Sequence, residues 1–191
     1  PAQRAGRVPE DRVWRRPSPR PTTRGVLLLV DASVSTQAEI GAWQVQVQQA
    51  ASVLQRLAAH STVWAFASDG RHRVRMQRLK DWDEPHEAVP WGSLRAGGST
   101  RLGAALRHAQ RLCTQGIRRL GLGSCAVILL TDGELHDIDV HDSRYLGADL
   151  QHALRELRDR GVLVQALLSA PSSMMRRSLG ASACFPADPP H

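Results

Sequence analysis

Aromatic residues make up only 4% of this 191-residue chain, yet apolar residues reach 42%, enough for the core of one ordinary domain. Cysteine is also scarce: Cys113, Cys125 and Cys184 form neither a CxxC pair nor an even-numbered framework, which fits a reducing cytoplasm. We expect the first two to be small buried side chains.

No apolar run approaches the roughly eighteen residues of a membrane span, and no basic segment followed by an apolar one opens the chain. The sequence therefore predicts a soluble protein without a membrane partner.

Acidic residues are in the minority, with 18 Asp and Glu against 25 Lys and Arg, and the formal net charge is +7. Such a charge raises the possibility of nucleic-acid binding. However, residues 1–24 hold seven Arg against only Glu10 and Asp11, so five of the seven net charges lie in this stretch. With five Pro and no apolar period, residues 1–24 are predicted to be a linker or tail, as are residues 186–191 at the other end. We expect no nucleic-acid partner.

Residues 25–185 alternate strand-like and helix-like segments. Val26–Val30 and Ala126–Leu130 are apolar at every position, which is typical of parallel strands buried on both faces. Elsewhere apolar residues recur every three or four positions, as in amphipathic helices. The pattern predicts an α/β fold of the doubly wound, Rossmann-like type, with a mostly parallel central sheet and helices on both faces. The expected helices are 40–57, 102–113, 146–157 and a short one at 174–179, and the other expected strands are 62–67, 74–79, 162–168 and 184–185.

Three local features complete this prediction. Residues 74–79 alternate apolar and charged side chains after a Ser68-Asp69-Gly70 turn, so we expect an antiparallel edge strand in a hairpin with 62–67. Thr36 is a candidate N-cap for the helix at 40–57. Residues 81–98 are predicted to hold a short helix before a Gly-rich loop.

Oxygen-bearing side chains follow the two fully apolar strands. Asp31, Ser33 and Ser35 come directly after the first, and Asp132 ends the second, while Thr100 stands at the entrance of the helix between them. In open α/β sheets, ligands bind at the carboxyl ends of strands where the strand order reverses. Carboxylates and hydroxyls suit a hard cation such as Mg2+. The Asp-x-Ser-x-Ser stretch alone could equally be a helix-capping loop. Together with Thr100 and Asp132, in this order and on these elements, it predicts a metal site.

This set of residues resembles the von Willebrand factor A (VWA) domain and its metal-ion-dependent adhesion site (MIDAS): DxSxS, then a loop Thr, then an Asp. The resemblance implies that Ser33, Ser35 and Thr100 coordinate Mg2+ directly and that Asp31 and Asp132 hold it through waters. It also implies that the remaining coordination is open to an acidic side chain of a partner.

Further motifs flank these residues: Ser68-Asp69-Gly70-Arg71-His72, Lys80-Asp81, Glu84-Pro85, residues 99–108, Thr131-Asp132-Gly133-Glu134, Asp137-Ile138-Asp139-Val140 and Arg144-Tyr145-Leu146. Together they are similar to the CbbO and NorD group of VWA proteins, which work with a MoxR-type AAA+ ATPase. Gly133-Glu134 and Asp137–Val140 look more like CbbO. The resemblance implies an adaptor, most like the C-terminal domain of CbbO, that recognises Rubisco for its activase with a CbbQ-like ATPase, in the bacterial cytoplasm or at the carboxysome. The alternative is a NorD-type domain that serves nitric oxide reductase with a NorQ-type ATPase.

An enzyme is the competing class. A dehalogenase-type phosphatase needs a second Asp where this chain has Ser33, and a triad of Ser33, Asp132 and His141 would lack the GxSxG elbow. Gly121-Leu122-Gly123 precedes its strand, whereas a phosphate-binding loop would follow one. We therefore expect no catalysis, metal-dependent hydrolysis included, and no ATP chemistry in this chain.

Two histidine-bearing segments have simpler explanations than metal binding. His108, on the helix after Thr100, is expected to support the site loop. A polar stretch could suggest a second metal site, but its close spacing favours a solvated loop. Its members are His136, Asp137, Asp139, His141 and Asp142.

Overall fold

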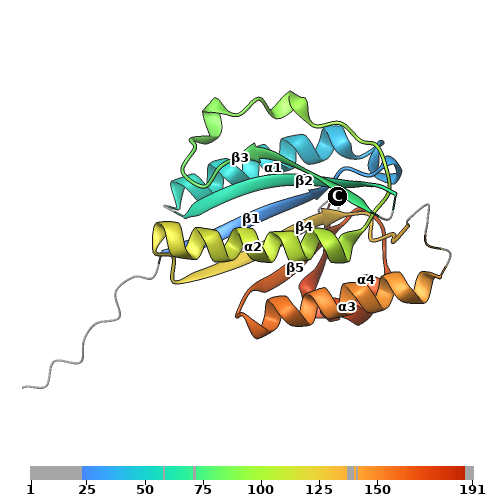
Figure 1. Ribbon diagram of the computed structural model, residues 1–191. Helices are drawn as coiled ribbons and strands as arrows, with labels where there is room; N and C mark the ends of the chain where they lie inside the picture. Colours follow the sequence, from blue (N-terminus) through green and yellow to red (C-terminus); the bar gives the residue numbers. More distant parts are fainter. Residues whose placement is uncertain (1–22, 58, 71, 137–139, 141, 188–191) are drawn as a thin grey trace, which may run out of the picture.

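The computed structural model describes residues 23–187, apart from 58, 71, 137–139 and 141. A six-stranded sheet, in the order β3-β2-β1-β4-β5-β6, runs through the middle of the domain (Figure 1). Every neighbouring pair is parallel except β2 and β3, which confirms the mostly parallel sheet with one antiparallel edge strand. The strands are β1 (Arg24–Asp31), β2 (His60–Asp69), β3 (Arg73–Lys80), β4 (Ser124–Thr131), β5 (Leu163–Leu168) and β6 (Cys184–Pro186).

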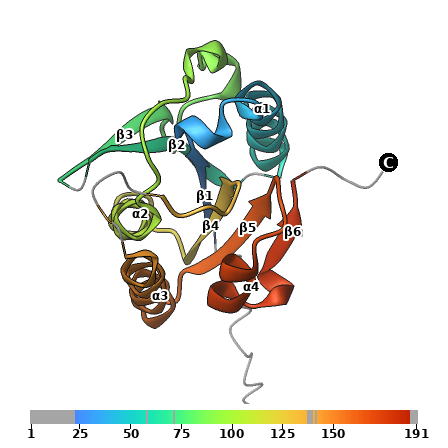
Figure 2. The same ribbon diagram turned by 90° about the vertical axis from the view of Figure 1, so that its right-hand side faces the viewer.

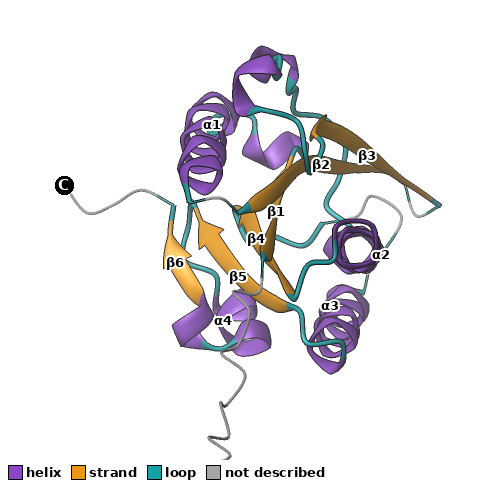
Figure 3. Cartoon of the chain, turned by 90° about the vertical axis from the view of Figure 1, so that its left-hand side faces the viewer, coloured by secondary structure: helices purple, strands orange, loops and turns teal. Residues whose placement is uncertain are grey.

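Helices cover both faces of the sheet, as predicted (Figures 2 and 3). One face carries α1 (Ile40–Arg56), and the other carries α2 (Leu102–Leu120) and α3 (Ser143–Asp159), which pack on each other. The short α4 (Ser173–Leu179) packs against α3 and β5. None of the helices in the described part of the chain is long and apolar enough to cross a bilayer.

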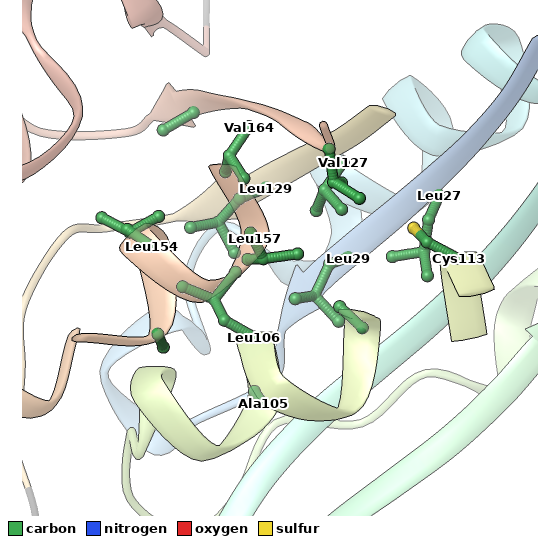
Figure 4. Close-up of a cluster of buried hydrophobic side chains, with 14 of the residues drawn as sticks. Leu27, Leu29, Ala105, Leu106, Cys113, Val127, Leu129, Leu154, Leu157 and Val164 are labelled. Atoms are coloured by element: carbon green, nitrogen blue, oxygen red, sulfur yellow. The ribbon is translucent and has the colours of Figure 1, made fainter. Parts of the chain in front are cut away.

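The central strand β1 is apolar at successive positions because both of its faces are buried. Leu27 and Leu29 point into the core beneath α2 and α3, whereas Leu28 and Val30 belong to the core beneath α1. Figure 4 shows Leu29 among side chains of α2, α3, β4 and β5. Side chains of a strand alternate between faces, so two cores require the uninterrupted apolar run seen in the sequence.

The strand order reverses between β1 and β4. From β1 the chain passes through α1 to β2 and β3 on one side, and α2 then carries it across to β4 on the other. The loops that follow β1 and β4 therefore leave adjacent strand ends toward helices on opposite faces of the sheet, which is where ligands bind in open α/β sheets. This is the edge of the sheet at which the sequence placed its oxygen-bearing side chains.

The secondary structure of residues 81–98 differs from the one predicted from the sequence. Two single 3-10 turns, η2 (His86–Ala88) and η3 (Trp91–Ser93), stand where one short helix was expected. Pro85 and Pro90 precede these turns, and a proline disfavours helical geometry in the residue before it, so neither turn can extend backward into a helix.

Candidate metal centre

The loop after β1 begins with an acid at the end of a buried strand. The Asp31 carboxylate is fully buried, and its Oδ1 accepts a hydrogen bond from the Ser33 N–H at 3.0 Å. Ser33 is buried and Ser35 is exposed, yet their hydroxyl oxygens are only 3.0 Å apart. The loop thus brings two hydroxyls together at the point where the interior meets solvent.

The side chain of Thr36 stabilises this loop through hydrogen bonds to its backbone. Its hydroxyl is within hydrogen-bond distance of two carbonyl oxygens, those of Asp31 (3.0 Å) and Ser33 (2.9 Å). The expectation that Thr36 caps the following helix is wrong, because α1 begins at Ile40 with Glu39 in the N-cap position. The buried hydroxyl satisfies loop carbonyls instead and fixes the backbone that carries Ser33 and Ser35.

The Gly-rich loop before α2 is joined to the first loop by backbone hydrogen bonds. The N–H of Gly97 donates to the Ala32 carbonyl at 2.8 Å, and the N–H of Val34 donates to the Gly98 carbonyl at 2.9 Å. Gly98 has a φ of +85°, and a Cβ there would lie 2.6 Å from the Ser68 carbonyl oxygen. Only glycine combines this backbone conformation with so close an approach.

The loop after β4 joins the same cluster. The N–H of Thr100 donates to the His136 carbonyl at 2.8 Å, and the Asp132 carboxylate accepts the Glu134 N–H at 2.9 Å. Thr100 and Asp132 are both buried, with 2% and 8% of their surfaces exposed. The three segments predicted to converge at this edge of the sheet therefore do so.

Thr131 is a member of this cluster that the sequence analysis missed. Its hydroxyl donates to Oδ2 of Asp31 at 2.8 Å and accepts the Gly133 N–H at 3.1 Å. The side chain is completely buried between β1 and β4. Its signal in the sequence is a hydroxyl at the end of an apolar strand, just before the acid, Asp132.

The electrostatic state of Asp31 is unusual for a carboxyl group. Burial, assisted by the nearby negative charge of Asp132, raises its pKa to about 7 against the opposing effect of hydrogen bonds from Ser33 and Thr131. Among the described residues, the interactions that set this pKa include no positive charge. A buried carboxylate without a cationic partner is costly, and a bound cation would compensate it.

The donor set fits a hard divalent cation. Two carboxylates and three hydroxyls offer oxygen alone, with neither imidazole nor thiolate, which suits Mg2+ rather than zinc. In the described part of the chain, no three His, Cys, Asp or Glu side chains gather into a metal-binding group, so the hydroxyls are essential to any such site.

Other candidate residues from the sequence fall outside this cluster. Residues 137–139 and 141, which include two acids and the histidine of the alternative triad, lie outside the described residues. His136 has an exposed side chain and contributes its backbone carbonyl. His108 packs edge-on against Trp64, with ring centroids 5.6 Å apart, and so lies along the side of α2 rather than in the site loop.

The comparisons with known proteins agree with this architecture. The model of the family "VWA domain containing CoxE-like protein" matches residues 2–183. The chain belongs to this family. The match begins within residues 1–24, so it includes the stretch predicted to be a linker or tail.

Among curated relatives, Protein NorD of Brucella abortus is 34% identical over 172 residues, and Protein NorD of Stutzerimonas stutzeri is 33% identical over 152 residues. These alignments cover 85% and 72% of this chain but only 26% and 23% of the relatives. The chain thus spans about a quarter of the length of the NorD proteins that it matches.

Solved structures show the same fold at low sequence identity. The VWA domain of SpRpn10 superposes with a TM-score of 0.59 and 11% identity, covering 88% of this chain and 90% of that one. Proximal thread matrix protein 1 of the mussel byssus gives 0.62 and 18%, covering 86% of this chain and 43% of that one. These similarities confirm the predicted VWA-like α/β fold.

Proposed function

We propose that this domain is the non-catalytic, Mg2+-dependent recognition element of a NorD-type protein, and that it binds an acidic side chain of its target at the cluster around Asp31. The observation that carries the proposal is the buried carboxylate of Asp31, which lies beside paired hydroxyls and for which no described residue supplies a positive charge among the interactions that set its pKa.

In this proposal the residues of the cluster divide into two groups. The hydroxyls of Ser33, Ser35 and Thr100 hold the ion directly, while Asp31 and Asp132 hold it through water. An Mg2+ ion surrounded mainly by neutral hydroxyls keeps much of its positive charge and so attracts an incoming carboxylate. The hydrogen bonds from Thr36 and to Gly98 keep the hydroxyl-bearing loop in one conformation before the target arrives.

In this proposal Ser33 is a metal ligand rather than a nucleophile. Its hydroxyl lies 3.0 Å from the Ser35 hydroxyl and also hydrogen-bonds to the Asp31 carboxylate. Asp31 accepts hydrogen bonds from Ser33 and Thr131 and so serves as an anchor of the loop. Reaction chemistry in the whole protein would then belong to a partner, for which a MoxR-type ATPase of the NorQ kind is the candidate.

The similarity to NorD proteins favours nitric oxide reductase over Rubisco as the target. The Rubisco-activating role expected from the Gly133-Glu134 and Asp137–Val140 motifs is not supported by the relatives described above, which are NorD proteins. Nitric oxide reductase is therefore the target that we propose. Because the chain spans a quarter of those relatives, the complete protein would carry the contacts with the ATPase.

The test is capture of purified nitric oxide reductase by this domain in Mg2+ and in EDTA, with Rubisco as the comparison target. Capture should require Mg2+ and should be lost in Asp31→Ala and Ser33→Ala. Two exposed residues away from the site, Asp159 and Ser124, provide matched controls as Asp159→Ala and Ser124→Ala, which should bind like wild type. Binding that is indifferent to EDTA would refute the role of the metal, and capture of Rubisco alone would refute the target.

A further inference from the structure

A groove runs along the side of α2 that faces β2 and β3, away from the candidate metal centre. Figures 2 and 3 show that the β2–β3 hairpin extends past α2, so the helix covers only part of this face of the sheet. Two cavities, of about 630 Å3 and about 260 Å3, lie between α2 and the β2–β3 hairpin. His108 lines both, so they adjoin at this side chain.

The groove is elongated along α2. Its lining on α2 extends from Ala104 to Arg119, which is about 22 Å along a helix that rises 1.5 Å per residue. An extended peptide of six or seven residues has roughly this length at about 3.3 Å per residue. A chain segment therefore fits the shape better than a compact small molecule does.

The floor of the groove is apolar. Val74 and Met76 form it at one end, and Trp64, Leu112 and Trp82 continue it toward the other. The first two and Trp64 remain partly exposed, so they present apolar surface that no described element covers. Side chains of a bound segment could bury this surface, which is the main source of affinity in peptide grooves.

The rim of the groove is positively charged. Five arginines line it against a single acid, although three of the five are ion-paired with Asp81, Asp83 or Asp149. The other two, Arg111 and Arg118, are exposed and make no ion pair with any described residue. The other members are Arg78, Arg107, Arg119 and Asp81. An occupant with acidic side chains would gain from this field, and a basic one would be repelled.

We propose that this groove docks a peptide segment of a partner protein in which acidic side chains flank aliphatic or aromatic ones. A single nucleic-acid strand would also suit the charge, but it needs open aromatic faces for stacking. Trp82 is 5% exposed, Trp64 is partly exposed but packs against the His108 ring, and Val74, Met76 and Leu112 offer no stacking surface. The floor therefore favours a peptide.

The surface differs from the proposed metal centre in both position and chemistry. Thr100 lies at the start of the helix and the groove along its side, so one helix would connect two binding surfaces. Loss of the metal centre should leave peptide binding intact, which makes failures of the two proposals distinguishable.

The test uses the whole chain and fluorescein-labelled short peptides that alternate aspartate with leucine and phenylalanine, read by fluorescence anisotropy. The comparison probes are the same peptides with lysine for aspartate and a labelled oligothymidine. We expect the acidic peptides to bind, the lysine peptides not to bind, and affinity to fall as salt rises.

The decisive variant is the double substitution Arg111→Glu and Arg118→Glu, which changes exposed, unpaired side chains and so should not affect folding. It should weaken peptide binding roughly tenfold or more, since two favourable charge contacts become unfavourable. The matched control reverses two exposed arginines of α3, as Arg155→Glu and Arg158→Glu, and should bind like wild type. Asp31→Ala should also bind normally.

A second variant, Met76→Glu, places a charge on the apolar floor and should abolish binding. Because Met76 also packs against the core, the melting temperature is measured to establish that the variant is folded. Equal binding of acidic and lysine peptides, no binding of either, or tighter binding of the oligothymidine would each overturn the proposal. So would self-association of the chain that the double arginine variant abolishes, because the groove would then be a contact between copies.

Discussion

Thr131 donates its hydroxyl to Oδ2 of Asp31 at 2.8 Å across the boundary between β4 and β1. One hundred residues of sequence separate the two side chains, yet both are completely buried. This bond and the one from the Ser33 N–H hold the carboxylate in a single orientation. Asp31 is thereby fixed before any cation arrives.

Thr131→Val tests this relationship because valine has nearly the same shape but lacks the hydroxyl. We expect a loss of about 1–3 kcal/mol in the free energy of unfolding, because the buried Gly133 N–H loses its acceptor. Mg2+ affinity, measured by titration calorimetry, should also fall. Thr131→Ser keeps the hydroxyl and should restore most of the affinity, whereas equal affinities in all three proteins would contradict a positioning role.

Asp31→Asn removes the buried negative charge and retains a side chain of similar size. In EDTA, the variant should be at least as stable as wild type, since the uncompensated charge is gone. Added Mg2+ should raise the melting temperature of wild type but not that of the variant, because a ligand that binds only the folded state stabilises it. An equal Mg2+-induced shift in both proteins would place the ion elsewhere.

Gly98→Ala should distort the loop that leads to Thr100. The added Cβ would lie 2.6 Å from the Ser68 carbonyl oxygen, and the φ of +85° is unfavourable for alanine. We expect a loss of about 1–3 kcal/mol in the free energy of unfolding, measured with urea, and weaker Mg2+ binding.

Gly41→Ala is the matched control for that substitution. Gly41 lies within α1, and a Cβ there would meet nothing within 4 Å. Alanine should therefore raise stability by about 0.5–1 kcal/mol through its better helix propensity. If both alanine variants changed stability by the same amount, close packing at Gly98 would not be the cause.

The features that could be predicted from the sequence depend on local patterns. Uninterrupted apolar runs at 26–30 and 126–130 identified the two central strands, because only a strand buried on both faces needs such a run. The residue that follows a parallel strand necessarily lies at the carboxyl edge of the sheet. The convergence of Asp31 with Asp132 follows from these two facts and the reversal of strand order.

The features that could not be predicted depend on contacts between distant segments. The bond from Thr131 to Asp31, the approach of Gly98 to Ser68 and the packing of His108 on Trp64 leave no periodic trace in the sequence. Thr36 was misassigned for a similar reason, since a threonine before a helix has the same local signature whether it caps the helix or bonds to a loop.

The cysteines provide a test of packing that is independent of the proposed metal. Cys113 and Cys125 are buried as expected, with sulfurs 2.9 Å apart, and the hydrogen bond between them and burial raise the pKa of the Cys113 thiol far above its usual range. Burial also raises the pKa of Cys184. Since the thiolate is the reactive form, all three should react with Ellman's reagent slowly in the native domain and at once in denaturant. Ser124→Cys, at an exposed position, is the positive control, and rapid native labelling of Cys113 would contradict the packing.

His108 should make stability depend on pH. Burial, with the positive charge of Arg111, lowers its pKa below 6.5, so the unfolded chain takes up a proton more readily than the folded one. This contribution to stability is therefore complete above pH 6.5 and is lost as the pH falls from 6.5 toward the lowered value. In urea unfolding at successive pH values, His108→Gln should lose less stability than wild type over that interval. Parallel curves for wild type and His108→Gln would mean that the imidazole is as well solvated in the folded domain as in the unfolded chain.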